Sequence, residues 1–220
     1  MNCQVPGWAW GGSIGGAGGI IALSNDVSTI NGGAVYTLGS VGGVMDIDPG
    51  PDSLFVNSGA GVDLFIIKQN SAGDFVWGRT VGGTDLIFGH IIAINEVHGE
   101  SVYVAGQFSG TVDFDPGPNI FEIESIGSND CFIMKLDSNG IFQWAKSIGG
   151  NGNDQALSLA VDPQEGFVYT TGSYQGTTDF DPGQNTYLLQ AVGSADIFIS
   201  KLDENGSFVW AKSIGSGAYD

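Results

Sequence analysis

A short acidic motif occurs three times in the chain, and it is built from residue types that bind hard cations. The copies are Asp46-Ile-Asp48-Pro-Gly50-Pro-Asp52, Asp113-Phe-Asp115-Pro-Gly117-Pro-Asn119 and Asp179-Phe-Asp181-Pro-Gly183-Gln-Asn185. On an extended strand, the two aspartates that open each copy point to the same face. Carboxylates held so close repel one another unless solvent or a cation screens them, and calcium takes roughly six to eight oxygen ligands.

The motif has two interpretations, and both are open from the sequence. The first is a calcium site in each copy, with Asp63, Asp130 and Asp196 as possible additional ligands. The main candidate ligands over the three copies are Asp46, Asp48, Asp52, Asp113, Asp115, Asn119, Asp179, Asp181 and Asn185. The second is a structural β-turn, because Asp bonds the turn backbone, Pro presets φ and Gly supplies positive φ. The motif lacks the third spaced Asp and the distant Glu of an EF-hand.

Residues suited to catalysis form no recurring constellation. His90 and His98 have no further histidine or cysteine cluster with which to complete a zinc site. The glycine-rich stretch 11–19 lacks the Gly-Lys-Ser/Thr of a phosphate-binding loop, and we interpret it and its counterparts at 80–84 and 147–153 as turns. We therefore predict no catalytic residue and no enzymatic activity.

An enzyme of another class is the alternative. It would be a secreted hydrolase or lyase acting on polysaccharide, with an Asp-x-Asp pair as general acid and base. A pocket holding residues that occur in one copy only, such as His90, His98 or Glu100, would favour it.

The acidic motif belongs to a much longer repeat. Trp10, Trp77, Trp144 and Trp210 are separated by 67, 67 and 66 residues. The segments that begin Asp63-Leu-Phe-Ile, Asp130-Cys-Phe-Ile and Asp196-Ile-Phe-Ile then align without a gap. All six basic residues fall at two positions of this repeat, namely Lys68, Lys135 and Lys201, and Arg79, Lys146 and Lys212. We interpret them as structural, with the stem packed on a strand and the charged head near a carboxylate.

Each copy contains four strand-like runs separated by turn signals, and the third copy shows them at 156–161, 167–171, 197–202 and 207–212. An additional segment, 178–192, predicts a hairpin or ribbon. Four short antiparallel strands per repeat are typical of a β-propeller blade. We predict an all-β, propeller-type domain with a leading strand of an incomplete blade at 1–14, four-stranded blades at 15–77, 82–144 and 149–210, and the start of a further repeat at 211–220.

These motifs resemble the bacterial SBBP family, whose name denotes "seven-bladed β-propeller" repeats. The resemblance is carried by Gly110 to Gly117 with Asp130 to Gly150, and again by Gly176 to Gly183 with Asp196 to Gly215. The first copy departs from the pattern at Val44 to Asp48 and at Gln69-Asn70. The family implies a secreted or surface-exposed bacterial protein, often exported by the type IX secretion system, and it fixes no ligand and no activity.

Charge and composition limit the partners. The net charge of −18 argues against nucleic acid, which needs a basic surface, and against anionic membranes. No apolar run is long enough to span a bilayer. The two cysteines, Cys3 and Cys131, are too few for a disulfide framework, and we predict that Cys131 is a small core residue.

The expected function is that of a non-catalytic extracellular scaffold or adhesin that binds protein or glycan at its loops. Three blades cannot close a ring, since propellers have roughly four to eight. We therefore expect that the ring is completed either by other blades of a longer chain or by a second copy in a homodimer.

Overall fold

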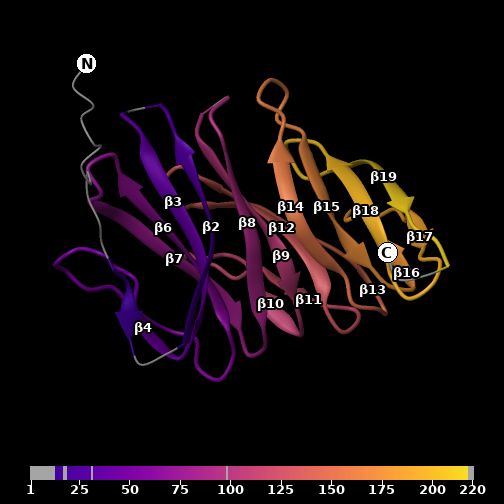
Figure 1. The fold of residues 1–220 in the computed structure, drawn as a ribbon, viewed down its shortest axis with the longest axis horizontal. Helices are drawn as coiled ribbons and strands as arrows, with labels where there is room; N and C mark the ends of the chain where they lie inside the picture. Colours follow the sequence, from indigo (N-terminus) through magenta and orange to yellow (C-terminus); the bar gives the residue numbers. More distant parts are fainter. Residues whose placement is uncertain (1–12, 17–18, 31, 98, 218–220) are drawn as a thin grey trace, which may run out of the picture.

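The computed structural model describes residues 13–16, 19–30, 32–97 and 99–217, and the regular structure in it is entirely β-strand (Figure 1). The predicted all-β class is thus confirmed. No helix within the described ranges is long and apolar enough to cross a membrane.

The strands follow the sequence repeat. Repeat 1 holds β1 (Gly15–Gly16), β2 (Gly19–Ser28), β3 (Ala34–Gly42), β4 (Val44–Asp46), β5 (Phe55–Asn57), β6 (Asp63–Asn70) and β7 (Phe75–Gly83). Repeat 2 holds β8 (Ile87–Asn95), β9 (Ser101–Phe108), β10 (Thr111–Asp113), β11 (Glu122–Glu124), β12 (Asp130–Asp137) and β13 (Phe142–Gly150). Repeat 3 holds β14 (Gln155–Val161), β15 (Val168–Tyr174), β16 (Thr177–Asp179), β17 (Leu188–Gln190), β18 (Asp196–Leu202) and β19 (Phe208–Ile214).

The four long strands of each repeat pair antiparallel in the order first, second, third, fourth. These sets are β2-β3-β6-β7, β8-β9-β12-β13 and β14-β15-β18-β19. The three sheets stand side by side in chain order, as an open row that the described residues do not close (Figure 1). The fourth strands continue past the tryptophans to Gly83, Gly150 and Ile214, beyond the limits at 77, 144 and 210 that the sequence suggested.

The short strands form ribbons, and the ribbons of repeats 2 and 3 each join the sheet of the preceding repeat. The hairpin expected within 178–192 is confirmed as part of the ribbon β16–β17. It pairs with β13 of repeat 2, as β10–β11 of repeat 2 pairs with β7 of repeat 1. Ribbon β4–β5 pairs in the same way with β1. The first two sheets therefore have six strands each, a linkage that the sequence did not predict.

A pair of glycines makes this linkage sterically possible. A Cβ on Gly83 would stand 2.4 Å from the carbonyl oxygen of Thr111, and one on Gly150 would stand 2.2 Å from that of Thr177. A side chain at either position would therefore push the ribbon away. The interpretation of these glycines as turns between blades is wrong, because they end β7 and β13 and pair with the ribbons.

The hydrophobic core lies between neighbouring sheets. One buried cluster joins Tyr36, Leu38 and Ile66 of repeat 1 to Ile92 and Val104 of repeat 2. A smaller cluster that includes Val41, Met45 and Phe65 lies within repeat 1 itself.

A second cluster repeats this arrangement one junction further along. It joins Tyr103, Ala105 and Ile133 of repeat 2 to residues of repeat 3 that include Leu159. Cys131 is fully buried in this cluster, which confirms its predicted place in the core.

A row of tyrosine, lysine and tryptophan crosses each sheet. In repeat 1, Tyr36 pairs with Lys68, and Lys68 pairs with Trp77 on the next strand. The ammonium group of Lys68 lies 4.9 Å from the centroid of the Tyr36 ring, and the Tyr36 and Trp77 rings meet edge to face at 5.8 Å. The cation thus lies over the Tyr36 ring, a contact that stabilises it through the quadrupole of the ring. The same register recurs as Tyr103, Lys135 and Trp144, and as Tyr169, Lys201 and Trp210.

The polar ends of the lysine and tryptophan side chains contact the next repeat. The indole Nε1 of Trp77 and the Nζ of Lys68 both donate to the carbonyl oxygen of Ser138, at 3.0 and 3.1 Å. Ser138 lies in the turn between the third and fourth strands of repeat 2. Lys68 also forms an ion pair with Glu100 at 3.0 Å, and Arg79 donates to the carbonyls of that same turn.

The junction between repeats 2 and 3 uses the same contacts. Trp144 Nε1 and Lys135 Nζ donate to the carbonyl oxygen of Glu204, at 3.1 and 3.4 Å. These contacts place Trp77 and Trp144 between neighbouring repeats. The predicted carboxylate is present as an ion pair for Lys68. Lys135 experiences the charge of the Glu204 carboxylate, and its Nζ also donates to the Glu204 backbone carbonyl.

We expect Trp77→Ala to lower the free energy of unfolding by about 3–5 kcal/mol, because it removes a buried ring and its inter-repeat hydrogen bond. Trp210→Ala is the matched control, since Trp210 occupies the same position in the last described sheet and makes no such bond to a following turn within the described residues. Urea denaturation of both variants measures the difference. Equal losses would show that the inter-repeat contact contributes nothing.

Candidate functional site

Each acidic loop joins the two strands of a ribbon, and its carboxylates bind the backbone of the loop itself. In repeat 2, Asp113 Oδ1 accepts hydrogen bonds from the backbone N–H groups of Asp115 and Phe121, at 3.1 and 2.8 Å. Asp115 Oδ1 accepts one from Gly117 at 2.8 Å. Equivalent bonds recur around Asp46 and Asp48 and around Asp179 and Asp181. The hydrogen bond from the Leu54 N–H, with that from Asp48, holds the pKa of Asp46 below its usual value.

The third oxygen ligand of each candidate calcium site lies apart from this arrangement. Asp52, Asn119 and Asn185 are exposed to solvent. Over the part of the chain that the structure describes, no three His, Cys, Asp or Glu side chains gather closely enough to hold a metal ion. The geometry fits the turn interpretation, and calcium binding by the nine residues stays a prediction.

Among the further candidate ligands, Asp130 and Asp196 are buried at the start of the third long strand of their repeats, and Asp63 is half-buried at the same position of repeat 1. Asp130 Oδ2 accepts from the Ile126 N–H at 3.0 Å, and Asp196 Oδ2 accepts from the Val192 N–H at 3.0 Å. The Oδ1 atoms of all three have no hydrogen-bond partner among the described residues. Such an atom is costly to bury as part of an anion.

Glycine provides the room for these carboxyl groups. A Cβ on Gly82 would stand 1.8 Å from Asp63 Oδ1, and one on Gly149 would stand 2.1 Å from Asp130 Cγ. Burial raises the pKa of Asp63 to about 6 and also raises that of Asp130. The fold therefore favours the protonated carboxyl more than the unfolded chain does.

A further buried aspartate, Asp154, belongs to repeat 3. Asp154 is fully buried, where it accepts from the Gly150 N–H at 3.0 Å and from the Thr178 hydroxyl at 3.1 Å. Burial raises its pKa to about 6, and the charge of Asp130 adds to this effect. Asp154 thus ties the end of β13 to the ribbon of its own repeat.

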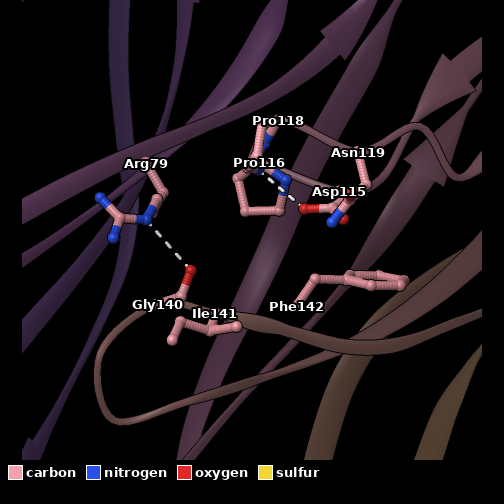
Figure 2. Close-up of a pocket in the computed structure, with 9 residues that line it drawn as sticks. Arg79, Asp115, Pro116, Pro118, Asn119, Gly140, Ile141 and Phe142 are labelled. Carbon is pink, nitrogen blue, oxygen red and sulfur yellow. Dashed lines mark hydrogen bonds between the residues drawn. The ribbon is translucent and has the colours of Figure 1, made fainter.

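A pocket of about 340 Å³ lies where repeats 1 and 2 meet. Figure 2 shows Arg79 on one side, the acidic loop 115–119 on another and the turn 140–142 below them. The guanidinium of Arg79 is held in place by the carbonyls of Gly78, Asn139 and Gly140.

The walls of this pocket combine polar and apolar groups. Asp115 and Asn119 provide oxygen and amide groups, whereas Ile141 and Phe142 provide an apolar surface. The Phe142 ring packs on Phe121 with 4.9 Å between centroids. The lining contains no histidine, cysteine or serine to serve as a nucleophile or base. This pocket was not predicted from the sequence, although Arg79 is the one arginine at a position that otherwise carries lysine.

His90 and Glu100, which would have favoured an enzyme, do not line this pocket. His90 Nδ1 lies 2.9 Å from the carbonyl oxygen of Ala156, and Glu100 is paired with Lys68 between repeats 1 and 2. His98 lies outside the described residues. His90 and Glu100 therefore connect neighbouring repeats, which fits a structural role.

We expect the chain to be more stable at pH 5 than at pH 7.5. Asp63 and Asp154 have folded pKa values raised to about 6 from 3.8, so the folded state binds protons more tightly than the unfolded chain. Stability is then highest below about pH 4 for these groups and falls as pH rises through 6. Groups with lowered pKa, such as Asp46 and Glu96, stay ionised across this window.

Thermal melts between pH 5 and 7.5 measure this dependence. Asp154→Asn should reduce it by on the order of 1–2 kcal/mol, whereas the exposed control Asp52→Asn should leave it unchanged. A wild-type melting temperature that rises from pH 5 to 7.5 would contradict the assignment of the raised pKa values.

For the acidic loops, we expect Asp113→Ala to lower stability by about 1–2 kcal/mol, because two backbone N–H groups lose their acceptor. Melting with a chelator and with excess calcium separates the two interpretations. A turn alone predicts identical melting temperatures, whereas a calcium site predicts a rise with calcium that Asp113→Asn combined with Asp115→Asn reduces.

The chain is similar at low identity to curated proteins, one of which is a WD-repeat protein. No family model matches the chain. Curated proteins similar to it include the "Uncharacterized WD repeat-containing protein L264" of Acanthamoeba polyphaga mimivirus, which is 25% identical over 195 residues, or 77% of this chain and 14% of that protein. They also include the "Regulatory protein FlaEY" of Caulobacter vibrioides, 28% identical over 198 residues, or 84% of this chain and 20% of that protein. The chain thus spans a fifth or less of the length of these relatives, and it is similar at low identity to a WD-repeat protein.

Proposed function

We propose that the chain is part of a β-propeller of the SBBP type, and that it serves as a non-catalytic scaffold on the outside of a bacterium. The similarity to a WD-repeat protein and the three adjacent antiparallel sheets support the propeller. The SBBP resemblance of the motifs supports the extracellular location. In this proposal the scaffold binds a protein partner at its ribbons and loops, with a glycan as the other ligand class.

The observation that carries the proposal is an unusual exposure of apolar side chains on and beside the ribbons. Phe55, Ile120, Ile126 and Leu188 are between 59% and 74% exposed. They recur on the ribbons of all three repeats, next to loops rich in carboxylates. Exposed apolar residues of this kind, flanked by charged groups, are typical of surfaces that bind other proteins.

The roles of the polar groups in the repeats also support a non-catalytic scaffold. The loop aspartates hold turns, and the lysine and tryptophan heads bind the following repeat. The pocket beside Arg79 combines a fixed guanidinium with Phe142 and Ile141, which suits a side chain of a protein partner. These groups are used for structure and recognition, and no bond-breaking chemistry is assigned to them.

We expect the purified chain to bind ligands on a displayed peptide library or a glycan array and to leave them chemically unchanged. Ile120→Asp should weaken that binding at least tenfold, because Ile120 is the most exposed of these apolar residues at 74%. Val209→Asp is the control, since Val209 is also exposed but lies on β19, which pairs with β18.

Mass spectrometry of the ligands after incubation gives the second readout. Release of oligosaccharides from a polysaccharide substrate would favour the hydrolase or lyase and contradict the proposal. Equal binding by wild type and Ile120→Asp would show that the ribbons are not the binding surface.

A further inference from the structure

One face of the last described sheet differs from its counterparts in the other two repeats. Strand pairing makes Tyr36, Tyr103 and Tyr169 equivalent, and likewise Ile66, Ile133 and Ile199. In repeats 1 and 2 these residues are buried against the following repeat. In repeat 3 both Tyr169 and Ile199 remain partly exposed.

The uncovered face contains a shallow pocket of about 200 Å³. Its lining includes Ser158, Ala160, Tyr169, Thr171 and Ile199. The equivalents of these residues in repeat 2 are Ile91, Ala93, Tyr103, Ala105 and Ile133, and all of them pack in the core shared with repeat 3. The pocket therefore occupies the place at which a neighbouring repeat packs in the two junctions already described.

The donors on this face also lack the acceptor that their equivalents have. Lys68 and Lys135 donate to the turn carbonyls of Ser138 and Glu204. Lys201 lies over the rings of Phe167 and Tyr169, at 3.4 and 5.2 Å. Neither Lys201 Nζ nor the indole N–H of Trp210 has an accepting turn carbonyl among the described residues.

Repeat 1, at the opposite end of the three sheets, has an exposed turn and an exposed apolar side chain that match this face. The turn 70–73 of repeat 1 matches the turns that contain Ser138 and Glu204, and Ser71 in it is exposed. On β2, Val27 is 56% exposed. Its equivalent Ile94 packs against the core between repeats 1 and 2.

We propose that the chain associates head to tail, so that the uncovered face of repeat 3 binds repeat 1 of a second copy. Lys201 and Trp210 of one copy donate to the carbonyl of Ser71 in the other, and Val27 covers the face beside Ala160 and Tyr169. The contact is heterologous, since two different surfaces meet. It does not depend on the proposed binding of a partner at the ribbons.

At this contact the end of β19 does not pair with the ribbon of the second copy. A repeat of the existing geometry would bring Gly215 and Ser216 of one copy to the place that Gly15 and Gly16 hold on ribbon β4–β5. A Cβ at Gly16 would stand 2.6 Å from the Val44 carbonyl oxygen. Since Ser216 carries such a Cβ, β1 keeps its place on the ribbon, and the interface rests on the sheet face.

Two copies with net charge −18 each repel one another, and salt screens that repulsion. We therefore expect sedimentation equilibrium in 0.5 M NaCl, about three times physiological ionic strength, to show a mass that rises with protein concentration above that of one chain. Ala160→Arg and Val27→Arg change exposed residues on the two opposite surfaces, and each should abolish the rise. Val209→Arg is the control, because this position is exposed in all three repeats.

Mixing the two defective variants gives the decisive result. The Ala160→Arg chain retains its repeat 1 surface, and the Val27→Arg chain retains its repeat 3 surface. Head-to-tail association predicts that the mixture forms two-chain particles and nothing larger. A wild-type chain that stays at the mass of one copy, a mixture that stays at single-chain mass, or a Val209→Arg variant as defective as Ala160→Arg would each overturn the proposal.

Discussion

The row of sheets depends on one backbone carbonyl at each junction. The carbonyl of Ser138 accepts hydrogen bonds from both Trp77 and Lys68, and the carbonyl of Glu204 does the same for Trp144 and Lys135. A carbonyl with two lone pairs is fully used by two donors. Because the acceptor is main chain, its position is set by the turn geometry of the following repeat, whether the residue is Ser138 or Glu204.

The ribbons add a second link across the same junctions, and the two links act at opposite ends of the fourth strand. The tryptophan binds the next repeat near the start of the strand, while the glycine pair at its end receives the next ribbon. Repeats 2 and 3 are thus each joined to the preceding repeat by a ribbon, which pairs with the preceding sheet, and by a turn, whose carbonyl accepts its hydrogen bonds. Stability in such a row is shared between neighbours, so that losing one junction weakens both repeats that form it.

Local patterns predicted the strands, because alternating apolar residues and Asx-Gly turns such as those around Gly140 act over a few residues. The sheet to which each ribbon belongs was not predictable in this way. Val112 pairs with Gly83, and no local pattern specifies a partner in the previous repeat. The Gly-Gly pairs were misread for the same reason, since the close approach of Thr111 that requires them is a tertiary contact. The pocket beside Arg79 likewise arises only once two repeats are packed together.

The acidic character of the chain follows from these roles more than from any ligand. Carboxylates such as Asp46 and Asp162 each accept two backbone N–H groups in tight turns, and these hydrogen bonds lower their pKa. Burial instead raises the pKa of Asp130 and of Asp154, and the charge of Asp130 adds to the rise at Asp154. The same residue type therefore serves two opposite purposes in one repeat. Exposure decides between them, because a turn at the surface solvates its anion while a sheet interior cannot.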